Sequence, residues 1–260
     1  MRYFLHLAYQ GYNFRGWQQQ PGAVRTVQGV MEAALQRILK HPVSAIGCGR
    51  TDAQVHASQY FLHFDTPVKL NAQFQFILNK TLPDSISVFD VLPVAERSHA
   101  RYDARSRQYD YLLHTEKQAF LPQLSALYQE GPLRIEAMEA AAQRLLGYQD
   151  FRAYCLKPDR HNTTLCQLQR VKLFTNPSRS RFRFQISANR FLRGMVRILV
   201  YRLLQVGWGR ISLAEFERPL QDGHAPEPMW SAHPQGLYLS KVTYPYLEVP
   251  PKVDLAFEQH

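Results

Sequence analysis

Hydrophobic and polar residues alternate over residues 2–9, which is the pattern of a half-buried β-strand. A stretch rich in Gly, Gln and aromatic residues follows and predicts a loop over 10–26. Apolar residues then recur at helical spacing from Val27 to Ile38, and Thr26 stands before them as a candidate N-cap. We expect His41-Pro42 to end this helix, since proline cannot continue it.

The same patterns recur along the rest of the chain. Further strands are predicted near 43–47, 57–64, 86–92, 107–114, 165–175, 181–187 and 237–243, with helices over 71–79, 135–146 and 190–206. Gly147 and Gly207 follow the last two helices as stop signals, and the Pro-rich residues 223–236 predict a loop. Strands and helices mix without a strict β–α–β order, which favours an α+β fold with largely antiparallel sheet.

Residues 96–114 connect two halves that resemble each other in pattern. We therefore expect two similar α/β halves joined at a central cleft. The first is a domain of residues 1–104 that carries the candidate catalytic aspartate, and the second is a domain of residues 105–260.

Composition points to a folded protein with a basic surface. The 260 residues are 45% hydrophobic and 20% charged, which excludes a disordered chain. Lys and Arg number 31 against 21 Asp and Glu, and 23 of the 31 are arginine. Because the planar guanidinium suits phosphate and stacks on bases, this bias points to a nucleic-acid partner, and a merely solvated basic surface is the equal alternative.

Cysteine usage and hydropathy indicate a cytoplasmic protein without a membrane segment. The three cysteines, Cys48, Cys155 and Cys166, are irregularly spaced and form neither a disulfide framework nor a C-x-x-C metal pair. The N-terminal residues enter a strand pattern directly, with no signal-peptide core. The most apolar helix carries Arg197 and Arg202 and is too short to cross a bilayer.

The stretch "GRTDAQVHA" (49–57) holds the first candidate for chemistry. Asp52 could simply cap a turn. It lies, however, in a loop between strands, where reactive groups are often placed, and Arg50 is two residues away. A nearby cation keeps a carboxylate ionised and able to act as a nucleophile or base.

Arginines after residue 178 form a second pattern. Arg181 and Arg183 alternate with Phe182 and Phe184, which predicts a strand with one cationic and one buried face. Next along the chain, three arginines recur along one side of the predicted helix: Arg190, Arg193 and Arg197.

Arg197 differs from the other two arginines because apolar residues surround it in the sequence. A buried arginine needs an acidic partner, and Asp52 is a candidate.

Two further sets of residues leave alternatives open. Tyr109 and Tyr111 share one face of a strand and could be ordinary core aromatics or stacking partners for bases. Asp52, His56 and His63 could form a metal-assisted hydrolase, but flanking strands at this spacing disfavour a metal, and we expect none. Cys48 ends an apolar strand, where burial is the usual role.

Six stretches, in order and over nearly the whole chain, resemble the bacterial tRNA pseudouridine synthase A (TruA) family. They are "YQGYNFRGWQ" (9–18), "RTVQGVMEAAL" (25–35), "GRTDAQVHA" (49–57), "HARYDARSRQYDY" (99–111), "NRFLRGMVRILV" (189–200) and "GLYL" (236–239). The resemblance implies isomerisation of uridine to pseudouridine at positions 38–40 of the anticodon arm of tRNA. It also implies a homodimer that needs no cofactor and no metal.

The resemblance assigns roles to particular residues. The family's catalytic aspartate falls on Asp52, and Arg197 is similar to the arginine that pairs with it. Arg50 resembles the arginine that helps to turn out the target base, and Tyr111 the tyrosine that stacks on it. The further residues expected to bind the substrate are Arg101, Arg181 and Arg183.

One position departs from the family pattern. Gln54 stands where the family usually has glycine, which would tolerate a positive φ or a close backbone approach. The departure leaves open a paralogue with a shifted RNA target. A catalytically silent tRNA-binding or tRNA-folding module is the other alternative.

Overall fold

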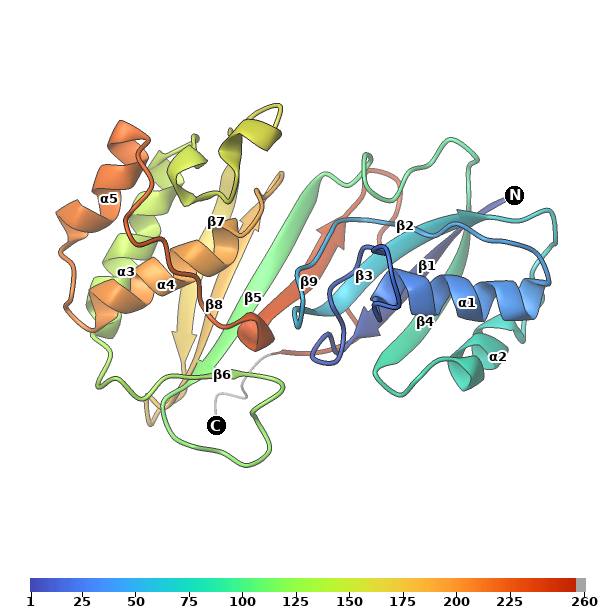
Figure 1. Ribbon diagram of the computed structural model, residues 1–260, viewed down its shortest axis with the longest axis horizontal. Helices are drawn as coiled ribbons and strands as arrows, with labels where there is room; N and C mark the ends of the chain where they lie inside the picture. The colour runs from blue at the N-terminus through green and yellow to red at the C-terminus, as the bar shows by residue number, and fades with distance from the viewer. Residues whose placement is uncertain (256–260) are drawn as a thin grey trace. The chain divides into compact units, whose positions relative to one another are not determined.

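The structure is a computed structural model that describes residues 1–255. The chain forms two compact units (Figure 1). Unit 1 consists of Met1–Arg105 together with Tyr238–Leu255, and unit 2 of Ser106–Leu237. The division expected from the sequence placed everything after residue 104 in the second half, whereas residues 238–255 pack with unit 1. The last five residues of that predicted half, 256–260, lie outside the described residues.

Unit 1 is built on a mostly antiparallel sheet with the strand order β4-β1-β3-β9. β1 (Arg2–Tyr9) pairs antiparallel with β3 (His56–Asp65) and β4 (Ile86–Val94), and β2 (Ile46–Gly47) pairs with β3. β9 (Leu237–Thr243) pairs parallel with β3. All of its residues except Leu237 belong to unit 1. These strands confirm the predicted pattern, although β2 is shorter than expected.

Two helices complete unit 1. α1 (Val27–Leu39) begins as predicted, with the Thr26 hydroxyl accepting a hydrogen bond from the Gly29 N–H at 3.2 Å. It ends before His41-Pro42 because Lys40 adopts a left-handed backbone, with φ at 62°. α2 (Phe74–Thr81) begins later than the predicted residue 71. The apolar side of α1, including Val27, Met31 and Leu35, is fully buried.

Within unit 2 the strand order is β5-β8-β7, and neighbouring strands pair antiparallel. The strands are β5 (Ser106–His114), β7 (Leu168–Thr175) and β8 (Arg181–Ala188), and β6 (Ala126–Leu127) pairs with β5. The helices are α3 (Ile135–Arg144), α4 (Met195–Gly207) and α5 (Leu213–Asp222), with short 3₁₀ turns at Leu145–Gly147, Arg152–Tyr154, Pro158–Arg160 and Pro234–Gly236.

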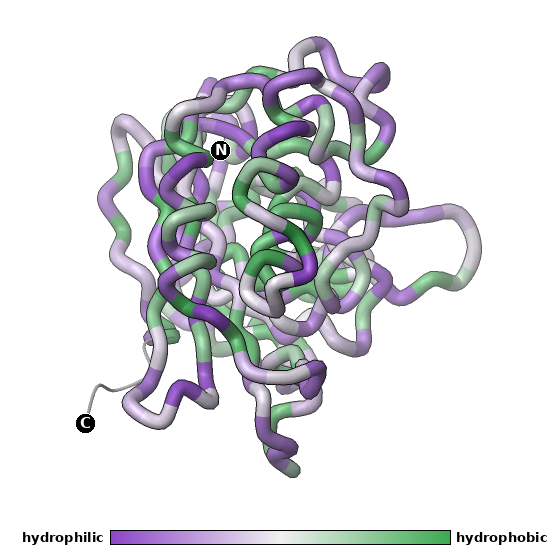
Figure 2. Tube along the Cα trace, turned by 90° about the vertical axis from the view of Figure 1, so that its left-hand side faces the viewer, coloured by the Kyte–Doolittle hydropathy of each residue, from purple (hydrophilic) through white to green (hydrophobic). Residues whose placement is uncertain are grey.

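The core of unit 2 lies between its sheet and the helices α3 and α4. Leu113 of the sheet, Met138 of α3 and Leu203 of α4 are almost completely buried there and line one small apolar cavity. Figure 2 shows hydrophobic stretches in the central elements and hydrophilic residues in the outlying loops. Together the two units confirm an α+β protein with mostly antiparallel sheet. Within residues 1–255, the helices are too short or too polar to cross a membrane.

α4 begins at Met195 and not at residue 190. Gly194 adopts a left-handed backbone, with φ at 74°, and marks the start of the helix. Arg190 and Arg193 therefore precede the helix, and the prediction that they share one helical side with Arg197 was wrong.

α5 was not predicted, although Ser212 and Glu215 form a capping box at its start. Pro219 lies inside this helix and cannot donate to the Glu215 carbonyl, so the sequence there does not indicate a helix. The Nη2 atom of Arg202 donates to that carbonyl at 2.7 Å instead. This contact satisfies the acceptor that proline leaves without its usual partner.

Candidate active site

Asp52 lies half-buried in the loop of residues 48–55, here named the Asp52 loop, between β2 and β3. The side-chain hydroxyl and the backbone carbonyl of its neighbour Thr51 both form hydrogen bonds. The Tyr9 and Thr51 hydroxyls lie 2.8 Å apart, and the Trp17 N–H donates to the Thr51 carbonyl at 3.1 Å. At the start of the loop, the Tyr60 hydroxyl donates to the Gly49 carbonyl at 2.5 Å. The backbone on the N-terminal side of Asp52 is therefore fixed by three aromatic residues.

A second loop, residues 10–18, packs backbone to backbone against the Asp52 loop. A Cβ atom on Gly11 would lie 1.9 Å from the Val55 carbonyl oxygen. A Cβ atom on Gly16, whose φ is +97°, would lie 2.6 Å from the Thr51 carbonyl oxygen. Both positions therefore require glycine. The motifs at 9–18 and 49–57, read separately in the sequence, form one scaffold that presents Asp52.

Gln54 adopts the positive φ that glycine would favour at this position, with a value of 66°. Its N–H donates to the Phe14 carbonyl at 3.1 Å, and the Val55 N–H donates to the Asp52 carbonyl at 3.2 Å. The turn after Asp52 is thus formed in spite of glutamine, at some cost in backbone strain.

Replacing Gln54 by glycine is expected to preserve or raise activity and to raise the free energy of unfolding by up to about 1 kcal/mol, since relief of the left-handed strain exceeds the entropy lost by glycine. Urea unfolding and tRNA turnover would measure both effects. Lys40→Gly, at another left-handed position (φ 62°) outside the loop, is the matched control and should stabilise without changing turnover. A folded Gln54→Gly protein with reduced turnover would show that the glutamine side chain has a role of its own.

The histidines of the alternative metal site serve the fold. His56 is buried, its Nδ1 accepts the Gly11 N–H at 3.1 Å, and its ring stacks on Tyr238. The Nδ1 of His63 accepts the Ala100 N–H at 3.1 Å, and burial lowers the pKa of His63 to about 4. Over the part of the chain that the structure describes, no three His, Cys, Asp or Glu side chains converge in a metal-binding group. Cys48 is buried, as expected.

Arg197, in unit 2, is half-buried on α4 and holds the segment that leads into β9. Its Nε donates to the Ala232 carbonyl at 2.7 Å and its Nη2 to the Ser231 hydroxyl at 3.1 Å. The Ala232 N–H in turn donates to the Arg197 carbonyl at 2.9 Å. The guanidinium therefore has a positioning role within unit 2.

Tyr111 is completely buried, and its hydroxyl is engaged in the core of unit 2. The hydroxyl donates to the His233 carbonyl at 2.9 Å and lies 3.1 Å from the Tyr128 hydroxyl. Burial raises the pKa of Tyr111 well above its ordinary value. Gly236 lies so close that a Cβ there would be 2.7 Å from the ring. The described conformation therefore disagrees with the expectation that Tyr111 presents its ring to a base.

Tyr109, two residues earlier on the same strand, is half-buried, and Phe191 contacts its ring edge-on with centroids 5.1 Å apart. Sequence periodicity placed both tyrosines on one face and could not separate them. Exposure separates them, and it favours Tyr109 for contact with a ligand.

The other predicted substrate-binding residues differ in their surroundings. Arg50 and Arg101 are exposed in unit 1, and Arg181 is half-buried at the start of β8. The predicted buried face of β8 is confirmed by Phe182 and Phe184. Arg183 is held inside unit 2, with its guanidinium 4.2 Å above the Phe174 ring and its Nε 3.7 Å from Asp110.

Comparison with known proteins identifies the family of this chain. The family model described as tRNA pseudouridine synthase matches residues 7–103 and 141–245. The chain therefore belongs to the tRNA pseudouridine synthase family.

Among curated relatives, proteins named tRNA pseudouridine synthase A match nearly end to end. The one from Porphyromonas gingivalis is 36% identical, over 94% of this chain and 97% of that protein. The one from Chlorobaculum tepidum is 38% identical, over 92% and 96%. The one from Parabacteroides distasonis is 39% identical, over 94% and 96%.

Proposed function

We propose that this chain isomerises uridine to pseudouridine in tRNA, at positions 38–40 of the anticodon arm, with Asp52 as the nucleophile. One observation carries the proposal: a half-exposed carboxylate is presented by two loops whose backbones are locked together through Gly11 and Gly16. A capping aspartate would not need such support. Family membership supplies the reaction class, the anticodon-arm target rests on the resemblance, and the proposed cytoplasmic location rests on the cysteine usage.

The chemistry suits a carboxylate. The target uridine must leave the base stack before its ring or sugar can be reached. Asp52 then attacks either the uracil ring or the ribose C1′, and the bond from N1 to C1′ breaks. The base turns and forms a bond from C5 to C1′, the C5 proton leaves to solvent, and N1 gains a proton. The carboxylate is released at the end, so the reaction consumes no cofactor.

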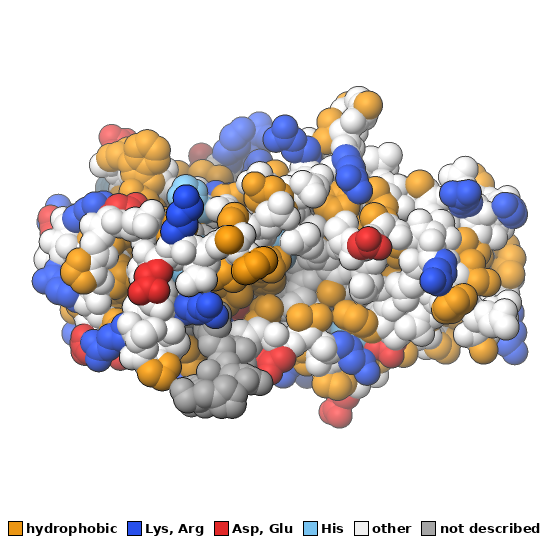
Figure 3. Space-filling model, turned by 90° about the horizontal axis from the view of Figure 1, so that it is seen from below, with side chains coloured by type: hydrophobic (Ala, Val, Ile, Leu, Met, Phe, Trp, Pro, Cys, Tyr) orange, Lys and Arg blue, Asp and Glu red, His pale blue; other side chains and the backbone are white. Residues whose placement is uncertain are grey.

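Five other side chains complete the proposed site. Arg50, exposed on the Asp52 loop, helps to turn out the base, and Arg197 pairs with the Asp52 carboxylate. Tyr109, in place of Tyr111, stacks on the uracil, because Tyr109 is half-buried whereas Tyr111 is completely buried. Arg101 and Arg181 contact phosphates, in keeping with the Lys and Arg side chains spread over the face shown in Figure 3.

Salt dependence tests the arginine contacts. Arg181→Ala is expected to weaken tRNA binding and to reduce the slope of log K against log salt by about one. Arg183→Ala should flatten the slope less and reduce stability more, because Arg183 contacts Phe174 and Asp110. Filter binding at several salt concentrations measures both slopes. An unchanged slope for Arg181→Ala would remove this residue from the phosphate contacts.

The activity itself is tested by tritium release from a tRNA transcript labelled at uridine C5. Release with purified protein, unaffected by a chelator, supports the proposal. Binding without release would support the silent RNA-binding module, and loss of activity with chelator the metal-assisted alternative. We also propose a homodimer, on the resemblance alone, and light scattering at micromolar concentration would test it.

A further inference from the structure

The segment of residues 97–105 in unit 1 presents an exposed aromatic ring among arginines. Tyr102 is 75% exposed, whereas tyrosine residues are usually at least partly buried. Arg97, Arg101 and Arg105 are exposed on the same segment, and the guanidinium of Arg101 lies over the Tyr102 ring at 5.8 Å. The segment lies outside the Asp52 loop, and the site described above uses only Arg101 from it.

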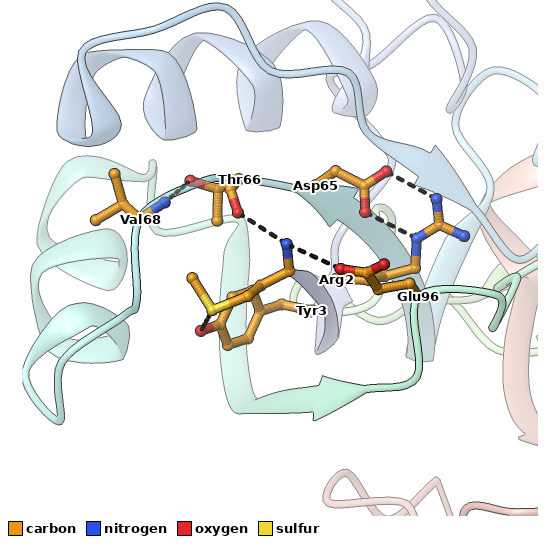
Figure 4. A network of polar contacts seen from close by, with 7 residues as sticks. Arg2, Tyr3, Asp65, Thr66, Val68 and Glu96 are labelled. Atoms are coloured by element: carbon orange, nitrogen blue, oxygen red, sulfur yellow. Dashed lines mark hydrogen bonds and ion pairs between the residues drawn. The ribbon is translucent and has the colours of Figure 1, made fainter.

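Contacts from distant parts of unit 1 hold the start of this segment in place. Arg2 forms a bidentate ion pair with Asp65, seen in Figure 4: its Nε donates to Oδ1 at 2.8 Å and its Nη2 to Oδ2 at 2.7 Å. Its remaining Nη1 donates to the Ser98 carbonyl at 2.9 Å. The Tyr244 hydroxyl donates to the Ala100 carbonyl at 2.6 Å. These bonds fix the backbone just before Tyr102.

The acid within the segment is also held by hydrogen bonds. The Oδ2 of Asp103 accepts from the His99 N–H at 2.7 Å and from the Tyr246 hydroxyl at 2.6 Å. These hydrogen bonds lower the pKa of Asp103. The segment is therefore rigid on both sides of Tyr102, and a ligand would lose little entropy in ordering it.

A series of contacting rings connects the buried His63 of unit 1 with the exposed Tyr102. His63 meets His99 edge-on with centroids 4.6 Å apart, and His99 stacks on Tyr102 at 4.2 Å. The Nδ1 of His99 accepts the N–H groups of Arg101 and Tyr102, which requires an unprotonated nitrogen. Burial lowers the pKa of His99 as well as that of His63. Tyr102 is thus the outermost member of a preformed series of contacting rings.

We propose that Tyr102 is a stacking platform for an unpaired base of the bound tRNA, with Arg97 and Arg105 placed to contact the adjoining phosphates. The inference rests on the proposed function, since it names part of the surface that receives the tRNA. An exposed ring backed by other rings, under one arginine and on a segment with two more, matches a single-stranded polyanion whose bases offer π faces. A protein partner would require a larger apolar area around the ring.

Binding of an unmodified tRNA transcript tests this proposal. Tyr102→Ala is expected to raise Kd by about 5- to 150-fold, which corresponds to about 1–3 kcal/mol per stacked base. Tyr102→Phe should stay within about twofold of wild type, because phenylalanine keeps the π face. The salt slope of Tyr102→Ala should be unchanged, since stacking releases no counterions.

The matched control is Phe76→Ala on α2. Phe76 is 65% exposed and also lies beneath a cation, Lys80, so it reproduces the exposed ring without the stack of histidines. Its loss should leave tRNA binding unchanged. A tRNA affinity of Tyr102→Ala within twofold of wild type, or an equal loss of affinity in Tyr102→Phe, would overturn the proposal that Tyr102 stacks on a base. These readings concern binding alone, so they are separate from a failure to release tritium, which would refute the proposed function.

Discussion

Asp52→Asn is expected to bind tRNA as the wild type does and to lose turnover by at least roughly a thousandfold, as when a covalent nucleophile is removed. Asparagine keeps the shape of the side chain but cannot form the covalent adduct. The loop should stay intact, because the hydrogen bonds described above are made by Thr51, Gly49 and the backbone of Asp52 and Gln54.

Tritium release measures the turnover of this variant, and filter retention measures its binding separately. Asp84→Asn, at an exposed aspartate before β4, is the matched control and should be fully active. Near wild-type turnover by Asp52→Asn would make the carboxylate structural and refute its proposed role.

Arg197→Ala is expected to reduce turnover roughly a hundredfold, which corresponds to about 3 kcal/mol, because the proposed pairing would keep the Asp52 carboxylate ionised. If Arg197 acts through Asp52, the double variant Asp52→Asn, Arg197→Ala should turn over no more slowly than Asp52→Asn alone. Additive losses would show that Arg197 acts independently of the aspartate.

Ser231→Ala separates the two roles of Arg197. It removes the hydroxyl that accepts from the arginine Nη2 but keeps the charge. If the guanidinium matters through its charge, this variant should remain within a few-fold of wild type. An equal loss in Ser231→Ala and Arg197→Ala would mean that Arg197 serves only to hold the segment before β9.

Most of the secondary structure could be predicted because apolar periodicity and capping residues act locally. β1 and α1 begin where alternation and Thr26 place them. The errors come from backbone conformations that depend on partners distant in the sequence. α4 begins late because Gly194 takes a left-handed turn beside Leu156, and α5 tolerates Pro219 because Arg202 satisfies the Glu215 carbonyl.

In the candidate site, too, locally determined features could be predicted and those that depend on distant residues could not. The sequence singled out Asp52 as a candidate, since its motif is contiguous, and correctly marked Gln54 as unusual, since its φ is positive. It could not show that Gly11 and Gly16 lock a second loop against the motif, since close approach depends on folding. Tyr109 and Tyr111 alternate identically on β5, and only Tyr128 and Gly236, far along the chain, make Tyr111 the buried one.

Position-resolved mapping of pseudouridine in an unmodified tRNA transcript, treated with the purified protein, tests the proposed activity and its target together. We expect pseudouridine to form at uridines in positions 38–40 with wild-type protein, and none to form with Asp52→Asn at the same concentration. Pseudouridine elsewhere only would support a shifted RNA target. A transcript that binds the wild-type protein but gains no pseudouridine would contradict the proposed function.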